Sequence, residues 1–259
     1  MRPASLFLPI LLFSPTLAAQ QPPQRDPQAV AILTQCLNAA GGAQTIAAIQ
    51  DFTASGTITY FWAGEQIQGS ATVRGRGVGQ FRLDANLPNG VRSWVASNGV
   101  GSLKELNGTV SSIPYHNAVN LGSLTLPYPL VRAATQDASV SLFYLGLIAT
   151  NGREAHHIRV RTNLPVGADP GGMISKLSKK DFFIDVNTLQ LLKTLDMVHP
   201  LKRSTEDYPH EIQFSDYRLA NGVLIPFLIT ETIVGQRTWI IQLNQISFNT
   251  GLSDSDFRL

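Results

Sequence analysis

Apolar residues recur at two different spacings along this chain, and the first spacing is helical. After Asp26-Pro27, the repeating apolar positions are Val30, Leu33, Leu37 and Ala40. An Asp at the N-cap, a Pro in the first turn and Gly41-Gly42 after the last turn are typical helix boundaries. The pattern predicts a helix from residue 27 to 40 with Cys36 on its apolar face. A short second helix is expected over 43–49.

From Phe52 onward the period changes to two, which is typical of half-buried antiparallel strands. Turn sequences such as Asn98-Gly99 and Asn221-Gly222 separate the alternating segments. The alternation predicts a long meander of about ten or eleven strands, over residues 52–62, 67–74, 80–85, 91–96, 140–150, 155–162, 180–186, 189–198, 211–219, 223–234 and 238–248. The chain has no βαβ alternation and no solenoid repeat, so the predicted fold class is mainly β (α+β).

Residues 112–135 interrupt this rhythm. The segment contains Pro114, Pro127 and Pro129 among several leucines, and it can form short helices over 118–124 and 130–135. Because the segment is apolar, we expect it to lie against the sheet. There it either fills an opening completely or covers a cavity.

The first residues have the pattern of a cleavable export signal. Arg2 precedes an apolar run from Leu6 to Leu17, and small residues follow it, so cleavage is expected after Ala18 or Ala19. The run is too short, and too interrupted by proline, to span a bilayer. We therefore expect a signal peptide over 1–19, a linker over 20–26, a single domain over 27–250 and a C-terminal tail over 251–259. The mature chain is expected to have no transmembrane segment and to reside in the periplasm or be secreted.

Composition narrows the class of protein. Charged residues make up 15% of the chain, against about 25% in ordinary domains, and the net charge is +2. This balance argues against a nucleic-acid binder, and the 44% hydrophobic content argues against disorder. The single cysteine excludes an internal disulfide framework.

No common catalytic or metal-binding motif is present in the sequence. His199 and His210 flank a polar loop with Glu206, Asp207 and Glu211 nearby, which leaves a metal pair or an unrecognised hydrolase site as one hypothesis. Histidines that cap turns are the simpler interpretation. We therefore predict no catalytic residue, no metal and no cofactor.

The late strands carry apolar residues on both faces, whereas a sheet with one solvent-exposed face needs them on only the other face. One face can pack on the N-terminal helix, and the other must meet a second layer, a partner or an apolar ligand. The candidate ligand-binding residues of an apolar cavity are Phe61, Trp94, Phe183, Leu192, Leu228, Trp239 and Ile241. The alternative is that residues 112–135 cover this face and leave no cavity.

Two hairpin sequences give the chain a family resemblance. The first begins Phe182-Phe-Ile-Asp185, and the second runs from Phe214 through Asn-Gly to Val223 and Pro226. Together with the N-terminal helix that ends in Gly-Gly, the chain resembles the LolA-like superfamily of periplasmic lipoprotein carriers over about residues 27–250. The resemblance implies an unclosed antiparallel barrel wrapped around a helical element, with an apolar cavity that accepts acyl chains.

The resemblance implies a non-enzymatic carrier or sensor for a lipid or an acylated lipoprotein, expected to be monomeric. No ligand-contacting residue of the family can be matched to a numbered position here. The alternative from a different class is a cell-envelope interaction module without a small ligand, whose second apolar face docks on another protein.

Overall fold

The computed structural model describes residues 23–118, 121, 126–163, 167–169, 171–200, 203 and 205–259. The predicted signal peptide lies outside these residues, as does most of the predicted helix over 118–124. The helices are α1 (Pro27–Ala39), α2 (Ala43–Ala47), α3 (Tyr115–Ala118), α4 (Tyr128–Gln136), α5 (Met173–Leu177) and the 3-10 helix η2 (Asp254–Phe257). None of the helices in the described ranges is long and apolar enough to cross a membrane.

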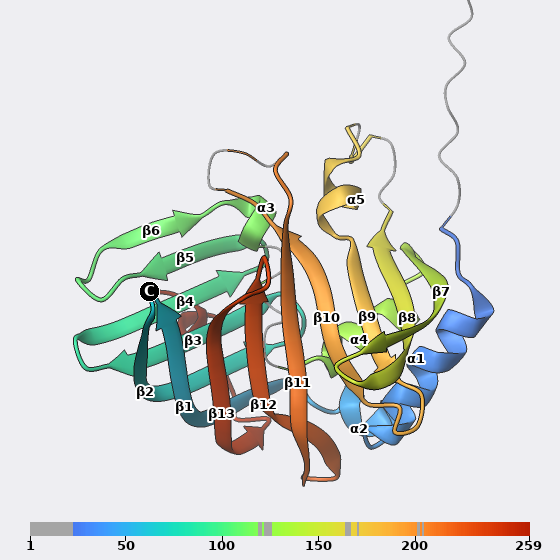
Figure 1. Cartoon of the computed structure of the whole chain (residues 1–259), viewed down its shortest axis with the longest axis horizontal. Helices are drawn as coiled ribbons and strands as arrows, with labels where there is room; N and C mark the ends of the chain where they lie inside the picture. Colours follow the sequence, from blue (N-terminus) through green and yellow to red (C-terminus); the bar gives the residue numbers. More distant parts are fainter. Residues whose placement is uncertain are drawn as a thin grey trace, which may run out of the picture.

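The described residues form one antiparallel sheet of thirteen strands (Figure 1). The strands are β1 (Asp51–Trp62), β2 (Glu65–Arg76), β3 (Gln80–Leu87), β4 (Gly90–Ser97), β5 (Val100–Lys104), β6 (Val110–Ile113), β7 (Val140–Thr150), β8 (Arg153–Thr162), β9 (Lys180–Asp185), β10 (Leu191–Val198), β11 (Tyr208–Ala220), β12 (Val223–Ile233) and β13 (Gln236–Phe248). The mainly β fold class is confirmed. The expected ten or eleven strands become thirteen because β5 and β6 were not predicted.

The strand order is β6-β5-β4-β3-β2-β1-β13-β12-β11-β10-β9-β8-β7. Strands that follow each other in sequence are neighbours, with the exception of β6 and β7, and β1 also pairs with β13. The edge strands β6 and β7 do not pair with each other, so the curved sheet stays open.

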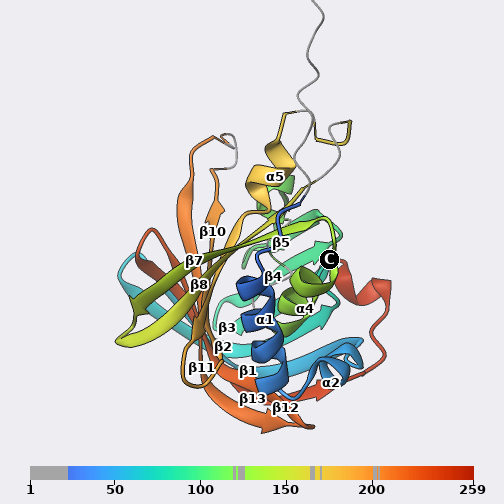
Figure 2. The same cartoon turned by 90° about the vertical axis from the view of Figure 1, so that its right-hand side faces the viewer.

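Helices α1 and α4 lie inside the curve of the sheet (Figure 2). The predicted apolar stripe of α1 is buried, with Leu33 and Cys36 both at 0% exposure, and Val131 of α4 is buried beside it in the same core. Asp26 caps α1, since its Oδ1 accepts a 2.8 Å hydrogen bond from the Gln28 amide. These helices fill one end of the concave face.

The predicted linker is tied to the sheet in its described part. Leu142 in β7 accepts a hydrogen bond from the Asp26 amide and donates one to the Gln24 carbonyl. The Arg25 guanidinium donates to four backbone carbonyls between residues 134 and 140. At the other terminus, Phe257 of η2 is buried although its segment was predicted to be a tail.

A close approach of two strands explains one glycine in β1. The pairing of β1 with β13 shifts register between Ser55 and Gly56. A Cβ placed on Gly56 would lie 2.0 Å from the Gln242 carbonyl oxygen. Only glycine fits here, and such an irregularity bends a strand and increases its twist. The end of β1 beyond this point carries the residues of the candidate site.

Candidate functional site

Two adjoining pockets lie against the concave face of the sheet. The first, the aromatic pocket, has a volume of about 220 Å³ and is lined by Tyr60, Phe61, Trp62, Arg92, Trp94, Glu231, Ile233, Thr238 and Trp239. The second, the apolar pocket, has a volume of about 230 Å³ and is lined by Trp94, Leu103, Ile113, Asn117, Leu121, Val198, His199, His210 and Ile233. Trp94 and Ile233 line both, so the two pockets are neighbours that share a wall, and we call them together the connected site.

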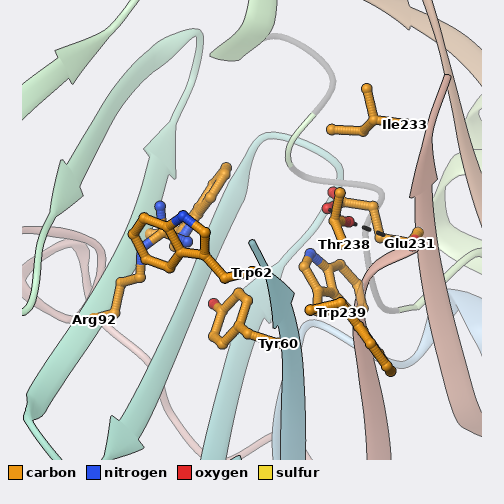
Figure 3. Close-up of a pocket in the computed structure, with 9 residues that line it drawn as sticks. Tyr60, Trp62, Arg92, Glu231, Ile233, Thr238 and Trp239 are labelled. Atoms are coloured by element: carbon orange, nitrogen blue, oxygen red, sulfur yellow. Dashed lines mark hydrogen bonds between the residues drawn. The ribbon is translucent and has the colours of Figure 1, made fainter. Parts of the chain in front are cut away.

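Strand periodicity explains how the aromatic pocket is assembled. Residues two apart on a strand point to the same face, so Tyr60 and Trp62 at the end of β1 share a face, as do Arg92 and Trp94 in β4. The β1–β13 register places Trp239 opposite Tyr60. Figure 3 shows Tyr60, Trp62 and Arg92 on one side of the pocket and Glu231, Thr238 and Trp239 on the other.

Arg92 lies among three aromatic rings on one wall of this pocket. Its guanidinium carbon is 5.4 Å from the ring centre of Tyr60, 5.8 Å from that of Trp62 and 5.0 Å from that of Trp94. Its Nε and Nη2 also donate to the Glu105 carboxylate at 3.0 and 3.3 Å. The ion pair and the cation–π contacts fix the guanidinium in place.

Two hydrogen-bond donors on the same wall have no partner among the described residues. They are the Tyr60 hydroxyl and the Trp94 indole Nε1, and both atoms are buried. Burial raises the pKa of Tyr60 to about 12, against the opposing effect of the Arg92 guanidinium, so the phenol stays protonated at neutral pH. A buried donor without an acceptor costs about 1–3 kcal/mol.

A buried chain of charges crosses the neighbouring strands. We call it the ionic ladder: Lys180 of β9, Asp196 of β10, His210 of β11 and Glu231 of β12. His210 donates from Nδ1 to Asp196 Oδ1 at 2.6 Å and from Nε2 to Glu231 Oε1 at 3.0 Å. Lys180 donates to the other oxygen of Asp196, and Thr238 donates to the other oxygen of Glu231.

The ladder holds His210 in its charged form. Although burial lowers the pKa of an imidazole, the carboxylates of Asp196 and Glu231 raise the pKa of His210 to about 10. Burial opposes ionisation of Asp196 in the same way, yet the charges of Lys180 and His210 lower its pKa to about 2. His210 is therefore an imidazolium at neutral pH and has no free nitrogen to act as a general base.

The two histidines of the hypothesised metal or hydrolase site each have other partners. Among the described residues, no group of three or more His, Cys, Asp and Glu side chains could hold a metal ion. His199 donates from Nδ1 to the Glu206 carbonyl at 3.0 Å. His210 lies inside β11 rather than in the loop, and its function is to bridge two carboxylates.

The predicted cavity residues fall in four places. Phe61, Trp94 and Trp239 line the aromatic pocket, while Ile241 is buried in the main core and Leu228 is half-buried on β12.

Phe183 and Leu192 lie outside both pockets, in a separate small cluster. Ala155 and the partly buried Leu195 complete that cluster. The His157 ring stacks on Phe183 at 4.6 Å, and Lys193 Nζ lies 4.7 Å from the centre of the Phe183 ring.

The sequence reasoning missed Tyr60, Trp62, Arg92 and the ladder residues. The pair Tyr60-x-Trp62 offered a usable signal, because it places two aromatic side chains on one face at the end of a strand, where a strand can border an opening of the sheet. The ladder carried none, since its members are scattered between residues 180 and 231 and only strand pairing brings them together.

The 112–135 segment covers part of the concave face without closing it. Leu121, Leu126, Val131 and Ala134 pack into the main core, and Ile113 and Leu121 also line the apolar pocket. Both expectations for this segment therefore hold in part: it fills the core at α4 and borders a cavity at its beginning.

Comparisons with known proteins place the fold. No family model and no curated protein matches the chain. A solved outer membrane lipoprotein-sorting protein domain from Vibrio parahaemolyticus has a TM-score of 0.57 at 14% identity, covering 89% of this chain and 96% of that one. A LolA superfamily protein from Nitrosomonas europaea has a TM-score of 0.55 at 7% identity, covering 89% and 98%. The chain thus has the LolA-like fold that its hairpins predicted.

Proposed function

We propose that this chain is an exported, non-enzymatic carrier or sensor that binds a lipid or an acylated protein in the connected site. The observation that carries the proposal is the apolar pocket, whose walls are mostly aliphatic and aromatic side chains. Ligand sites of this kind are apolar with a few placed polar groups, and they measure about 300–1,000 Å³. The two pockets together reach the lower part of that range.

The fold and the sequence support the same function. The structural neighbours include a lipoprotein-sorting domain, and the N-terminal residues carry the pattern of an export signal. The non-enzymatic part of the proposal is supported by the ionic ladder, in which each charged group is engaged by another side chain.

Uptake of a fluorescent fatty acid by the purified protein tests the proposal, together with mass spectrometry of lipids extracted from it. The matched pair of variants is Ile233→Trp, at the wall shared by both pockets, and Leu219→Trp, at a position 75% exposed. The first is expected to weaken uptake by about tenfold or more, and the second to leave it unchanged. A lipid-free protein that takes up no fatty acid contradicts the proposal.

The second candidate function is that of an envelope interaction module, and a specific surface favours it. Leu145, Leu147 and Ile148 on the edge strand β7 are exposed at 45%, 54% and 42%. If this surface is the functional part of the protein, light scattering should detect a protein–protein complex. Leu147→Ser should disrupt that complex. A protein that stays monomeric and loads fatty acid favours the carrier.

A further inference from the structure

The two pockets of the connected site differ in chemistry. The apolar pocket offers Leu103, Ile113 and Val198, which suit a hydrocarbon tail. The aromatic pocket offers the charge of Arg92 and the two unpartnered donors of Tyr60 and Trp94. Because Trp94 lines both, the two pockets are neighbours, as the polar head and the apolar tail of one ligand would require.

The polar groups of the Arg92 wall define which head fits. Tyr60, Trp94 and Arg92 all present N–H or O–H donors, and indole and guanidinium groups cannot accept hydrogen bonds. An acceptor with several lone pairs would satisfy the two buried donors. Each donor that is left without an acceptor costs free energy. A negatively charged acceptor would also gain from the adjacent guanidinium.

We propose that the aromatic pocket binds the oxyanion headgroup, carboxylate or phosphate, of a single-chain amphiphile. The Tyr60 hydroxyl and Trp94 Nε1 donate to that group beside Arg92, and the tail enters the apolar pocket. This inference rests on the carrier function proposed above and specifies the ligand class of the same site.

A cationic headgroup is the obvious competitor, because aromatic rings bind quaternary ammonium groups. Here the rings of Tyr60, Trp62 and Trp94 already surround the Arg92 guanidinium. The nearby carboxylates are also engaged, since Glu105 pairs with Arg92 and Glu231 is bound by His210 and Thr238. A second cation would therefore find these rings occupied and no unpaired carboxylate to balance it.

The test is a titration calorimetry series that varies only the headgroup. The probes are laurate, lauryl phosphate, lauryl alcohol and lauryltrimethylammonium, each below its micelle-forming concentration at about pH 7. Laurate or lauryl phosphate is expected to bind about tenfold or more tightly than lauryl alcohol, since hydrogen bonds to charged groups are the stronger ones. The tighter of the two oxyanions identifies the source, a fatty carboxylate or a phosphate.

Two variants connect the preference to the assigned donors. Tyr60→Phe removes only the hydroxyl. It is expected to weaken the binding of the preferred oxyanion by about tenfold while changing the affinity for lauryl alcohol by less than about threefold. Trp94→Phe should act in the same direction. Tyr208→Phe, an exposed position outside both pockets, is the matched control and should change neither probe.

The outcomes separate this inference from the function on which it rests. If lauryl alcohol or lauryltrimethylammonium binds as tightly as the oxyanions, or if Tyr60→Phe keeps the full preference, the headgroup assignment is overturned and the carrier function stands. If none of the four probes binds, both are overturned.

Discussion

Replacing His210 with glutamine removes the one imidazolium that joins two buried carboxylates. In the folded protein Asp196 and Glu231 receive the Nδ1 and Nε2 hydrogen bonds of His210 at 2.6 and 3.0 Å. After the substitution Asp196 keeps Lys180, and Glu231 keeps only the Thr238 hydroxyl. Both carboxylates are almost completely buried, so water cannot replace the lost cation.

The expected cost follows from that burial. Removing one partner of a buried ion pair typically destabilises a protein by about 3–5 kcal/mol. For a domain of this size each kcal/mol lowers the melting temperature by roughly 2–4 °C, so His210→Gln should lower it by roughly 6–20 °C. His157→Gln is the matched control, because Asp181 retains its two bonds from Arg159 at 2.7 and 2.8 Å. That change should cost about 1 kcal/mol or less.

The pH dependence gives the prediction a second readout. Since the pKa of His210 rises from 6.5 to about 10 on folding, its stabilisation is complete below about pH 6.5 and is lost as pH rises toward 10. The free energy of unfolding should therefore fall with pH in this range, with a limiting slope of about 1.4 kcal/mol per pH unit for one proton. Burial raises the pKa of Cys36 from 9.0 to about 12 and that of Tyr60 from 10.0 to about 12, so both groups add to the decline only from about pH 9 upward.

The assay is urea unfolding followed by circular dichroism at intervals between pH 6 and about 9, for the original protein and the two variants. The decline should be present in the original protein and in His157→Gln, and absent in His210→Gln. A flat profile for the original protein, or a His210→Gln variant as stable as the control, would refute the assignment of a buried imidazolium.

Three further predictions address other parts of the molecule. Without ligand, Tyr60→Phe should raise the free energy of unfolding by about 1 kcal/mol, because it removes an unpartnered buried hydroxyl; a loss of stability in a urea melt argues against this. Burial raises the pKa of Cys36 to about 12, so the native thiol should resist maleimide and react only after unfolding, and rapid native labelling contradicts its position. Gly56→Ala would place a methyl group against the Gln242 carbonyl and should cost about 2 kcal/mol or more; an unchanged melting temperature shows that the strands separate easily there.

Local sequence signals predicted the regular elements well where periodicity was strong. The alternation from Phe52 onward gave β1 almost to its final bounds, and Gly41-Gly42 marked the end of α1. Strands β5 and β6 escaped notice because both are short and their sequences, Val-Gly-Ser-Leu-Lys and Val-Ser-Ser-Ile, contain few apolar residues. Both lie at one edge of the sheet, where side chains bury less apolar surface.

The candidate site was only partly predictable. Excess apolar residues selected Trp94 and Trp239, which line the aromatic pocket, but the same argument selected Phe183 and Leu192, which pack with each other elsewhere. A single sequence cannot show which of several excess apolar residues share one surface, because strand register decides that. Burial of Asp196 and His210 was equally hidden, since their partners lie on neighbouring strands.

The adjacency of β1 and β13 in the middle of the sheet has a kinetic consequence. Most strands pair with their sequence neighbours and can form early as hairpins, yet the two halves of the sheet join only when β13 docks on β1. The backbone of Gln50 and the side chain of Asn249, at this seam, are hydrogen-bonded across 199 residues of chain. Contacts of such separation are slow to form, and until they form the edge of β1 stays open to pairing with other chains. We therefore expect the docking of β13 on β1 to be a late folding step, and the one that covers this edge.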